Sequence, residues 1–98
     1  MSDRRLANEL WPQLKDLAEI HGYLRVTRVD MIVGSLHGSS AETLAEDFRK
    51  VFRGSAYQGV DIRITVVAPG ESYSVPNSEE PQQASGWDIQ ITAIEGER

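Results

Sequence analysis

Residues 24–36 read LRVTRVDMIVGSL and predict a β-strand between two helical segments. Apolar side chains alternate with charged ones along it, which is the period of a β-strand with one well-buried face. The side chains of that buried face are Val29, Met31 and Val33. Val26 and Ile32 indicate some burial on the opposite face, and Gly34 near the end permits a bulge or close packing.

The segment that follows this strand is predicted to be a helix with both ends marked. Ser39 to Glu42 form a capping box, in which the Ser39 hydroxyl accepts from a backbone amide and Glu42 reaches back. Apolar side chains then recur at helical spacing: Leu44, Phe48, Val51 and Phe52. Basic residues in the last turns and Gly54 after them are typical of a helix end.

A second amphipathic helix is predicted before the strand, over residues 6–21. Its apolar stripe consists of Leu6, Leu10, Leu14, Leu17 and Ala18. Pro12 removes one hydrogen bond from the helix interior, so either the helix kinks there or it begins near that residue. We favour a single kinked helix because the stripe continues through Pro12. Gly22 after His21 ends it.

Two further strands are predicted at residues 59–68 and 87–95, where apolar and polar residues alternate again. Their apolar faces are Val60, Ile62, Ile64 and Val66 in the first, and Trp87, Ile89, Ile91 and Ala93 in the second. The order helix, strand, helix, strand, strand predicts an α+β fold, a two-layer sandwich with two helices packed on a three-stranded sheet. If the first two strands are parallel, their connection crosses over right-handedly.

A long loop, residues 69–86, joins the last two strands and holds three of the four prolines. A structureless stretch of this length is unusual in so small a domain. The sequence therefore predicts a functional loop, or the remnant of a segment that was inserted or lost.

Composition excludes several classes of protein. The 98 residues suffice for one domain, and the net charge of −5 without a basic stripe argues against a nucleic-acid partner. The absence of cysteine excludes disulfides, thiolate zinc sites and iron–sulfur clusters. No apolar run approaches the ~20 residues of a membrane span, and none follows the amino terminus as in a secretory signal. We expect a cytoplasmic protein without a membrane association.

Few side chains indicate chemistry. His21 and His37 are either metal or acid–base residues, or structural residues at a helix end and in a loop, and their spacing matches no known ligand motif. The turn 34–40 precedes a helix N-terminus, which is a position that binds anions. Ser39 and Ser40 are sufficiently explained as helix-capping residues. A nucleophilic role is not indicated, because no general base lies next to them in the sequence. We predict that the protein is not an enzyme and has no catalytic residues.

The amino terminus is the remaining candidate site. A free α-amine at Met1, the following backbone amides and the Asp3 carboxylate together can ligate a divalent ion such as nickel or copper. This capability is general to exposed amino termini and needs support from elsewhere in the chain.

The ordered set of segments resembles the hydrogenase nickel-incorporation proteins, the HypA/HybF family. The matching pieces are the first helix with His21-Gly22, RVTRVDMIVGSLHG at 25–38, the second helix, GVDIRITVV at 59–67, and SGWDIQITAIEGE at 85–97. The resemblance spans nearly the whole chain apart from residues 69–84. It implies a nickel-binding α/β domain and the role of a metallochaperone that works with a nickel-handling GTPase and the large subunit of nickel–iron hydrogenase.

The chain departs from this family at both of the family's metal sites. The family binds nickel through an amino-terminal Met-His-Glu, whereas here Met1 is followed by Ser2 in place of the histidine and Asp3 in place of the glutamate. The family's inserted zinc domain carries two CxxC motifs, and residues 69–86 stand in its place without any cysteine. We therefore expect weak nickel binding through Met1 and Asp3, with His21 and His37 as weaker candidates, and no zinc.

Three interpretations follow. The first is a HypA-like nickel-insertion accessory protein, a single domain over residues 1–98 with degenerate metal sites, acting as a monomer or homodimer. The second is a metal-free interaction or regulatory paralogue on the same scaffold, which Ser2 and the missing cysteines favour. The third, resting only on the turn 34–40, is a sensor or enzyme subunit that binds an anion.

Overall fold

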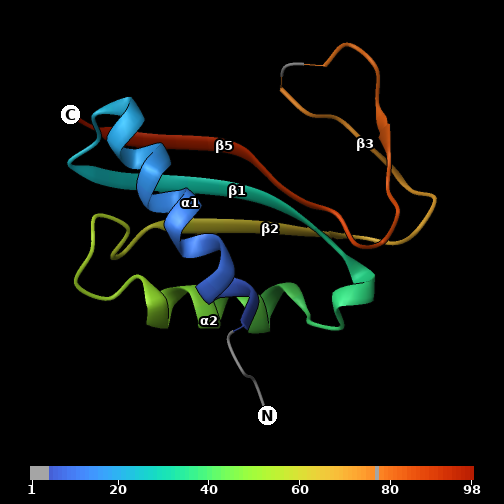
Figure 1. Cartoon of the computed structure of the whole chain (residues 1–98), viewed down its shortest axis with the longest axis horizontal. Coiled ribbons are helices and arrows are strands. Elements are labelled where there is room, and N and C mark those ends of the chain that lie inside the picture. Colours follow the sequence, from blue (N-terminus) through green and yellow to red (C-terminus); the bar gives the residue numbers. More distant parts are fainter. Residues whose placement is uncertain (1–4, 77) are drawn as a thin grey trace.

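The computed structural model describes residues 5–76 and 78–98 and has the predicted α+β architecture. Its main sheet has the strand order β2-β1-β5, and both helices contribute to one core on the same face of that sheet (Figure 1). The larger elements are α1 (Arg5–His21), β1 (Arg25–Gly34), α2 (Ala41–Val51), β2 (Asp61–Val67) and β5 (Ile89–Glu97). A short 3-10 turn, η1 (Ser35–His37), and two short strands, β3 (Ser72–Tyr73) and β4 (Gln82–Gln83), complete them.

The first helix, α1, runs unbroken through Pro12, which confirms the prediction of one helix. Its buried residues are Ala7, Leu10, Leu14 and Ala18. The hydroxyl of Tyr57, itself buried, donates to the carbonyl of Leu14 and ties α1 to the loop before β2. The helix ends at His21, and Gly22 after it has a φ of +70°, in the left-handed region.

The second helix, α2, begins one residue later than predicted. Ser40, not Ser39, is the N-cap, and its Oγ accepts from the Thr43 amide at 3.1 Å. Because Thr43 then occupies the third helical position, Glu42 is out of register for the reciprocal half of a capping box. The stripe itself is confirmed, since Leu44, Phe48 and Phe52 are buried.

The strand β1 pairs with β2 in parallel and with β5 antiparallel. The β1–β5 pair contains two register shifts, between Val26 and Arg28 and between Asp30 and Met31. The second shift leaves Thr92 as an extra residue, so the alternation along β5 changes phase. The prediction that Ala93 lies on the apolar face of this strand is therefore wrong. Beyond the shift, Ile94 is the residue that packs on the core.

Trp87 was also predicted to begin the last strand on its apolar face, and this is wrong. The strand β5 starts at Ile89, and Trp87 is 60% exposed. Gly86, with φ of +96°, turns the chain immediately before it, and Asp88 holds this turn through hydrogen bonds to the backbone. The local turn therefore overrides the alternation that the sequence shows.

The segment 69–86 is more ordered than a structureless loop, because it folds into the hairpin of β3 and β4. The amide of Gly70 donates to the carbonyl of Ala84, and the Ala84 amide donates to the Glu71 carbonyl. Side chains of this hairpin contact Ile32 of β1 and Val67 of β2. Its apolar contacts form a second cluster of Ile32, Val67, Tyr73 and Ala84.

Candidate functional site

The predicted ligands Met1 and Asp3, and Ser2 between them, lie outside the described residues. The described chain begins at Arg5, the first residue of α1, whose first turn carries no acidic side chain. Figure 1 shows that this end of α1 lies beside α2. The nickel site at the amino terminus stays a prediction.

His21 lies at the C-terminal end of α1 in a cluster of aromatic and basic groups. Its ring stacks on Tyr23, with centroids 5.2 Å apart and planes at 14°. The Arg98 guanidinium lies 5.9 Å from the Tyr23 ring centroid, and its Nε donates to the His21 carbonyl at 2.9 Å. These contacts join the C-terminus of the chain to the end of α1, which is a structural role for His21.

His37 ends the turn η1 beside a residue fifty positions away in the sequence. Its Nε2 lies 3.1 Å from the Trp87 carbonyl oxygen, and its ring meets the Trp87 ring edge-on at 5.4 Å. Because a carbonyl oxygen only accepts, Nε2 is the nitrogen that carries the proton in this contact. The neutral ring then keeps a lone pair on Nδ1, which is the nitrogen with the capacity to bind a metal ion.

The two histidines are not brought together. They flank opposite ends of β1, and a ten-residue strand separates them by about 30 Å. A shared metal site is thus excluded by geometry. Within residues 5–76 and 78–98, no group of three or more His, Asp or Glu side chains is arranged to hold a metal ion.

Asp88 organises the corner of the molecule where His37 contacts Trp87, and no sequence pattern predicts this role. Its carboxylate accepts from the amides of Ser85 and Gly86 at 2.8 and 3.0 Å, and from the Tyr73 hydroxyl at 2.8 Å. Desolvation alone raises the pKa of Asp88, but the hydrogen bonds from Tyr73 and from backbone amides outweigh it and hold that pKa below its usual value. Burial, together with the neighbouring carboxylate, raises the pKa of Tyr73.

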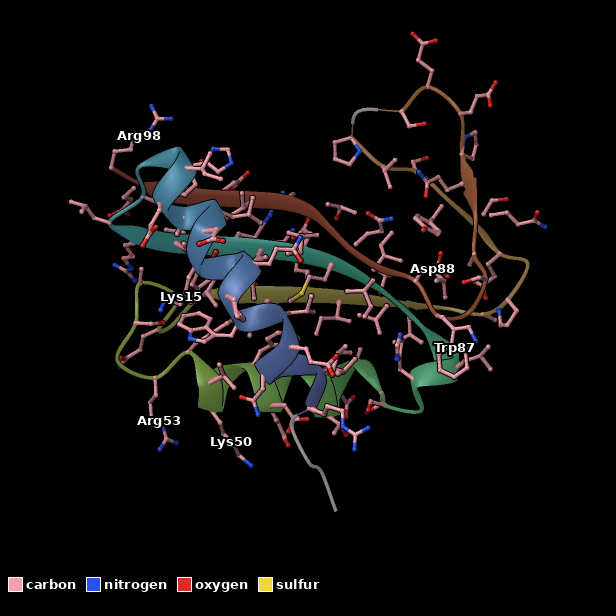
Figure 2. The ribbon with its side chains drawn as sticks, viewed as in Figure 1. Lys15, Lys50, Arg53, Trp87, Asp88 and Arg98 are labelled. Carbon is pink, nitrogen blue, oxygen red and sulfur yellow. The ribbon has the colours of Figure 1, made fainter. Side chains whose placement is uncertain are left out.

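The same corner depends on a close approach of two glycines. A Cβ on Gly34 would lie 2.0 Å from the Gly86 carbonyl oxygen, so only glycine fits there. The amide of Leu36 donates to that carbonyl at 2.9 Å. Leu36 and Trp87 are 47% and 60% exposed, so this corner presents apolar side chains to solvent. Figure 2 labels Trp87, whose ring contacts that of His37. This arrangement suits contact with another molecule and contains no nucleophile–base pair.

The fold of this chain is found among solved structures. No protein-family model matches the sequence, and no curated protein matches it. Among solved structures, the chain is similar to the solution structure of the nickel metallochaperone HypA from Helicobacter pylori, with a TM-score of 0.64 and 13% identity. That alignment covers 99% of this chain and 98% of the other.

A second solution structure, of a protein described as HypA, gives a TM-score of 0.64 at 12% identity, covering 98% of this chain and 96% of that one. The two-layer α+β fold is therefore shared with HypA along the whole chain. In the described part of this chain, no helix has the length and apolar character needed to cross a bilayer.

Proposed function

We propose that this protein is a HypA-like accessory factor that supports nickel insertion into nickel–iron hydrogenase or another nickel enzyme. The observation that carries the proposal is the fold likeness to a nickel metallochaperone over 99% of the chain. In this proposal the protein acts in the cytoplasm, as a monomer or homodimer, and binds a nickel-handling GTPase or the large subunit of the hydrogenase.

The proposal takes residues 1–98 as one HypA-like domain, with segment 69–86 at the place where the family inserts its zinc domain. In this chain the strands β3 and β4 of that segment pair with each other. No cysteine is present in the chain, so the hairpin has no thiolate ligands with which to bind zinc. The hairpin instead packs on the sheet through apolar contacts of Tyr73 and Ala84.

Nickel is the cargo in this proposal, and its binding is weak. The Met1 amine, the backbone amides after it and the Asp3 carboxylate supply the ligands, while Ser2 lacks the imidazole nitrogen that the family uses. His37 is a weaker candidate through Nδ1, and His21 is weaker still because its ring stacks on Tyr23. Since the similar Helicobacter pylori protein is described as a metallochaperone, we assign no catalytic residue in this proposal.

Isothermal titration of nickel into tag-free chain that begins at Met1 tests the proposal. We expect one-to-one binding in the micromolar range that is lost in Asp3→Ala and in a chain extended by one N-terminal glycine. His37→Ala measures the contribution of this weaker candidate and is expected to lower the affinity less than Asp3→Ala does. Binding no stronger than that of an unstructured peptide would contradict the proposal.

A second candidate is a metal-free interaction or regulatory protein on the same scaffold. It is favoured by Ser2 in the position of the ligand histidine and by the missing cysteines. This candidate predicts a partner that is recovered equally with and without a chelator. Stoichiometric nickel in natively purified protein would contradict it.

A further inference from the structure

The outer edge of β2 is open for pairing. In the sheet β2-β1-β5, no described strand lies on the far side of β2. This strand pairs with β1 over seven residues without a register shift, so its edge is regular. The opposite edge strand, β5, is distorted by two register shifts against β1. A regular edge presents backbone N–H and C=O groups with which an added strand can form hydrogen bonds.

The helix α2 forms a wall beside this edge. Figure 1 shows α2 running alongside β2, on the side away from β1. A hollow of about 500 Å³ lies between the two elements. Ala41 and Ala45 on the helix wall are small, and Ile62 and Ile64 on the strand are only partly buried. An added strand would therefore have room between helix and edge, with an apolar floor for alternate side chains.

The charge around this hollow is opposite in sign to that of the whole chain. A second hollow of about 490 Å³ continues from the first and shares Glu46 and Arg49 with it. The charged residues that line the two are four basic and two acidic, in a chain of net charge −5: Arg49, Lys50, Arg53, Arg63, Glu42 and Glu46.

Three of these basic groups are available to a partner. Arg63 is engaged by Asp61 at 3.0 Å, whereas no ion pair within residues 5–76 and 78–98 engages Arg49, Lys50 or Arg53. Figure 2 shows Lys50 and Arg53 projecting outward at the C-terminal end of α2. Complementary charge therefore favours an acidic occupant.

We propose that the edge of β2 and the facing side of α2 bind an extended, carboxylate-bearing segment of a partner protein. The segment adds to the sheet as a fourth strand beside β2. Its apolar side chains face Ile62 and Ile64, and its carboxylates reach Arg49 and Arg53. This inference goes beyond the proposed function, and it needs no metal, so nickel binding and docking fail or succeed separately.

Two nine-residue peptides are the probes, one alternating valine with glutamate and the other valine with lysine. Each is titrated into ¹⁵N-labelled full chain while ¹H–¹⁵N spectra are recorded without metal. We expect the valine–glutamate peptide to shift the amides of residues 41–53 and 61–67 saturably, and the valine–lysine peptide to leave them in place. Absence of saturable shifts, or shifts confined to other elements, would overturn the proposal.

Charge variants separate specific docking from general attraction. The double variant Arg49→Glu with Arg53→Glu is expected to lower the affinity for the valine–glutamate peptide roughly tenfold, because two exposed ion pairs are lost. The control, Lys15→Glu with Arg25→Glu, changes the net charge equally at two exposed sites outside the hollows. Equal weakening by both double variants would overturn the proposal.

Two further measurements test the added strand itself. Ala45→Trp fills the hollow from the helix side and is expected to abolish binding while the dispersed spectrum shows that the fold is kept. A valine–glutamate peptide that is N-methylated throughout cannot donate backbone hydrogen bonds. Binding of this peptide as strong as that of the parent would show that no strand is added.

Discussion

Phe48→Ala tests the packing on which the two-layer fold depends. Phe48 is 0% exposed, and its ring lies 5.5 Å from that of Phe52 in the core between the helices and the sheet. Truncation of a fully buried phenylalanine costs about 3–5 kcal/mol, because the transfer free energy is lost and a cavity remains. A domain of this size has a total stability of about 5–15 kcal/mol, so the loss is a large share of it.

The expected shift in the melting temperature follows from the same figure. At roughly 4–8 °C for each kcal/mol in a domain of this length, Phe48→Ala lowers the midpoint by at least about 12 °C. Circular dichroism at 222 nm during heating measures it, and urea unfolding gives the free energy. The control is Leu24→Ala, at a side chain that is 81% exposed, with an expected change within about 0.5 kcal/mol. Equal midpoints for Phe48→Ala and the control would refute the placement of Phe48 in the core.

Gly34→Ala is expected to lower the free energy of unfolding in urea by about 1–3 kcal/mol, since its methyl group would overlap the Gly86 carbonyl. A loss no greater than that of the exposed-site control Leu24→Ala would contradict the contact. The folded state lowers the pKa of Asp88, so this carboxylate adds stability above its unfolded pKa that is lost as pH falls through the folded pKa. Asp88→Asn should therefore lower the urea midpoint at pH 7 and make the midpoints at pH 7 and pH 3 differ less than in the parent protein. An unaltered pH dependence of the midpoint would refute this. Burial raises the pKa of Tyr57 to about 12. The protonated hydroxyl therefore adds stability that is fully present below the unfolded pKa of about 10 and is lost as pH rises through the folded pKa of about 12. An absorbance titration at 295 nm should show one tyrosine ionising near pH 12 that is missing in Tyr57→Phe, and ionisation of every tyrosine near pH 10 would contradict its burial.

The elements of the fold could be predicted because their apolar residues recur at the period of a helix or strand. The stripe through Leu44 and Phe48 specifies α2, and the alternation through Val29 and Met31 specifies β1. Register shifts could not be predicted, since an extra residue such as Thr92 leaves no mark in the pattern before it. A bulge changes which face every later side chain occupies.

The site was harder to predict than the fold, because its contacts join distant parts of the sequence. His37 meets Trp87 only when β1 and β5 pair, and Asp88 meets Tyr73 only when the hairpin folds back. The alternation of apolar residues predicts Trp87 in the core. Hydrogen bonds to Asp88 instead hold a turn that leaves Trp87 exposed. Ser40 and Ser39 are chemically equivalent as caps, so geometry alone decided between them.

The location of bound nickel tests the central claim most directly. ¹H–¹⁵N spectra are recorded while nickel is added to ¹⁵N-labelled, tag-free chain and, in parallel, to chain extended by one N-terminal glycine. The account predicts that one equivalent perturbs the amides in the first turns of α1, from Arg5 onward, and that the extended chain loses this effect. Perturbation centred on His21 or His37 instead, or none at one equivalent, would contradict it.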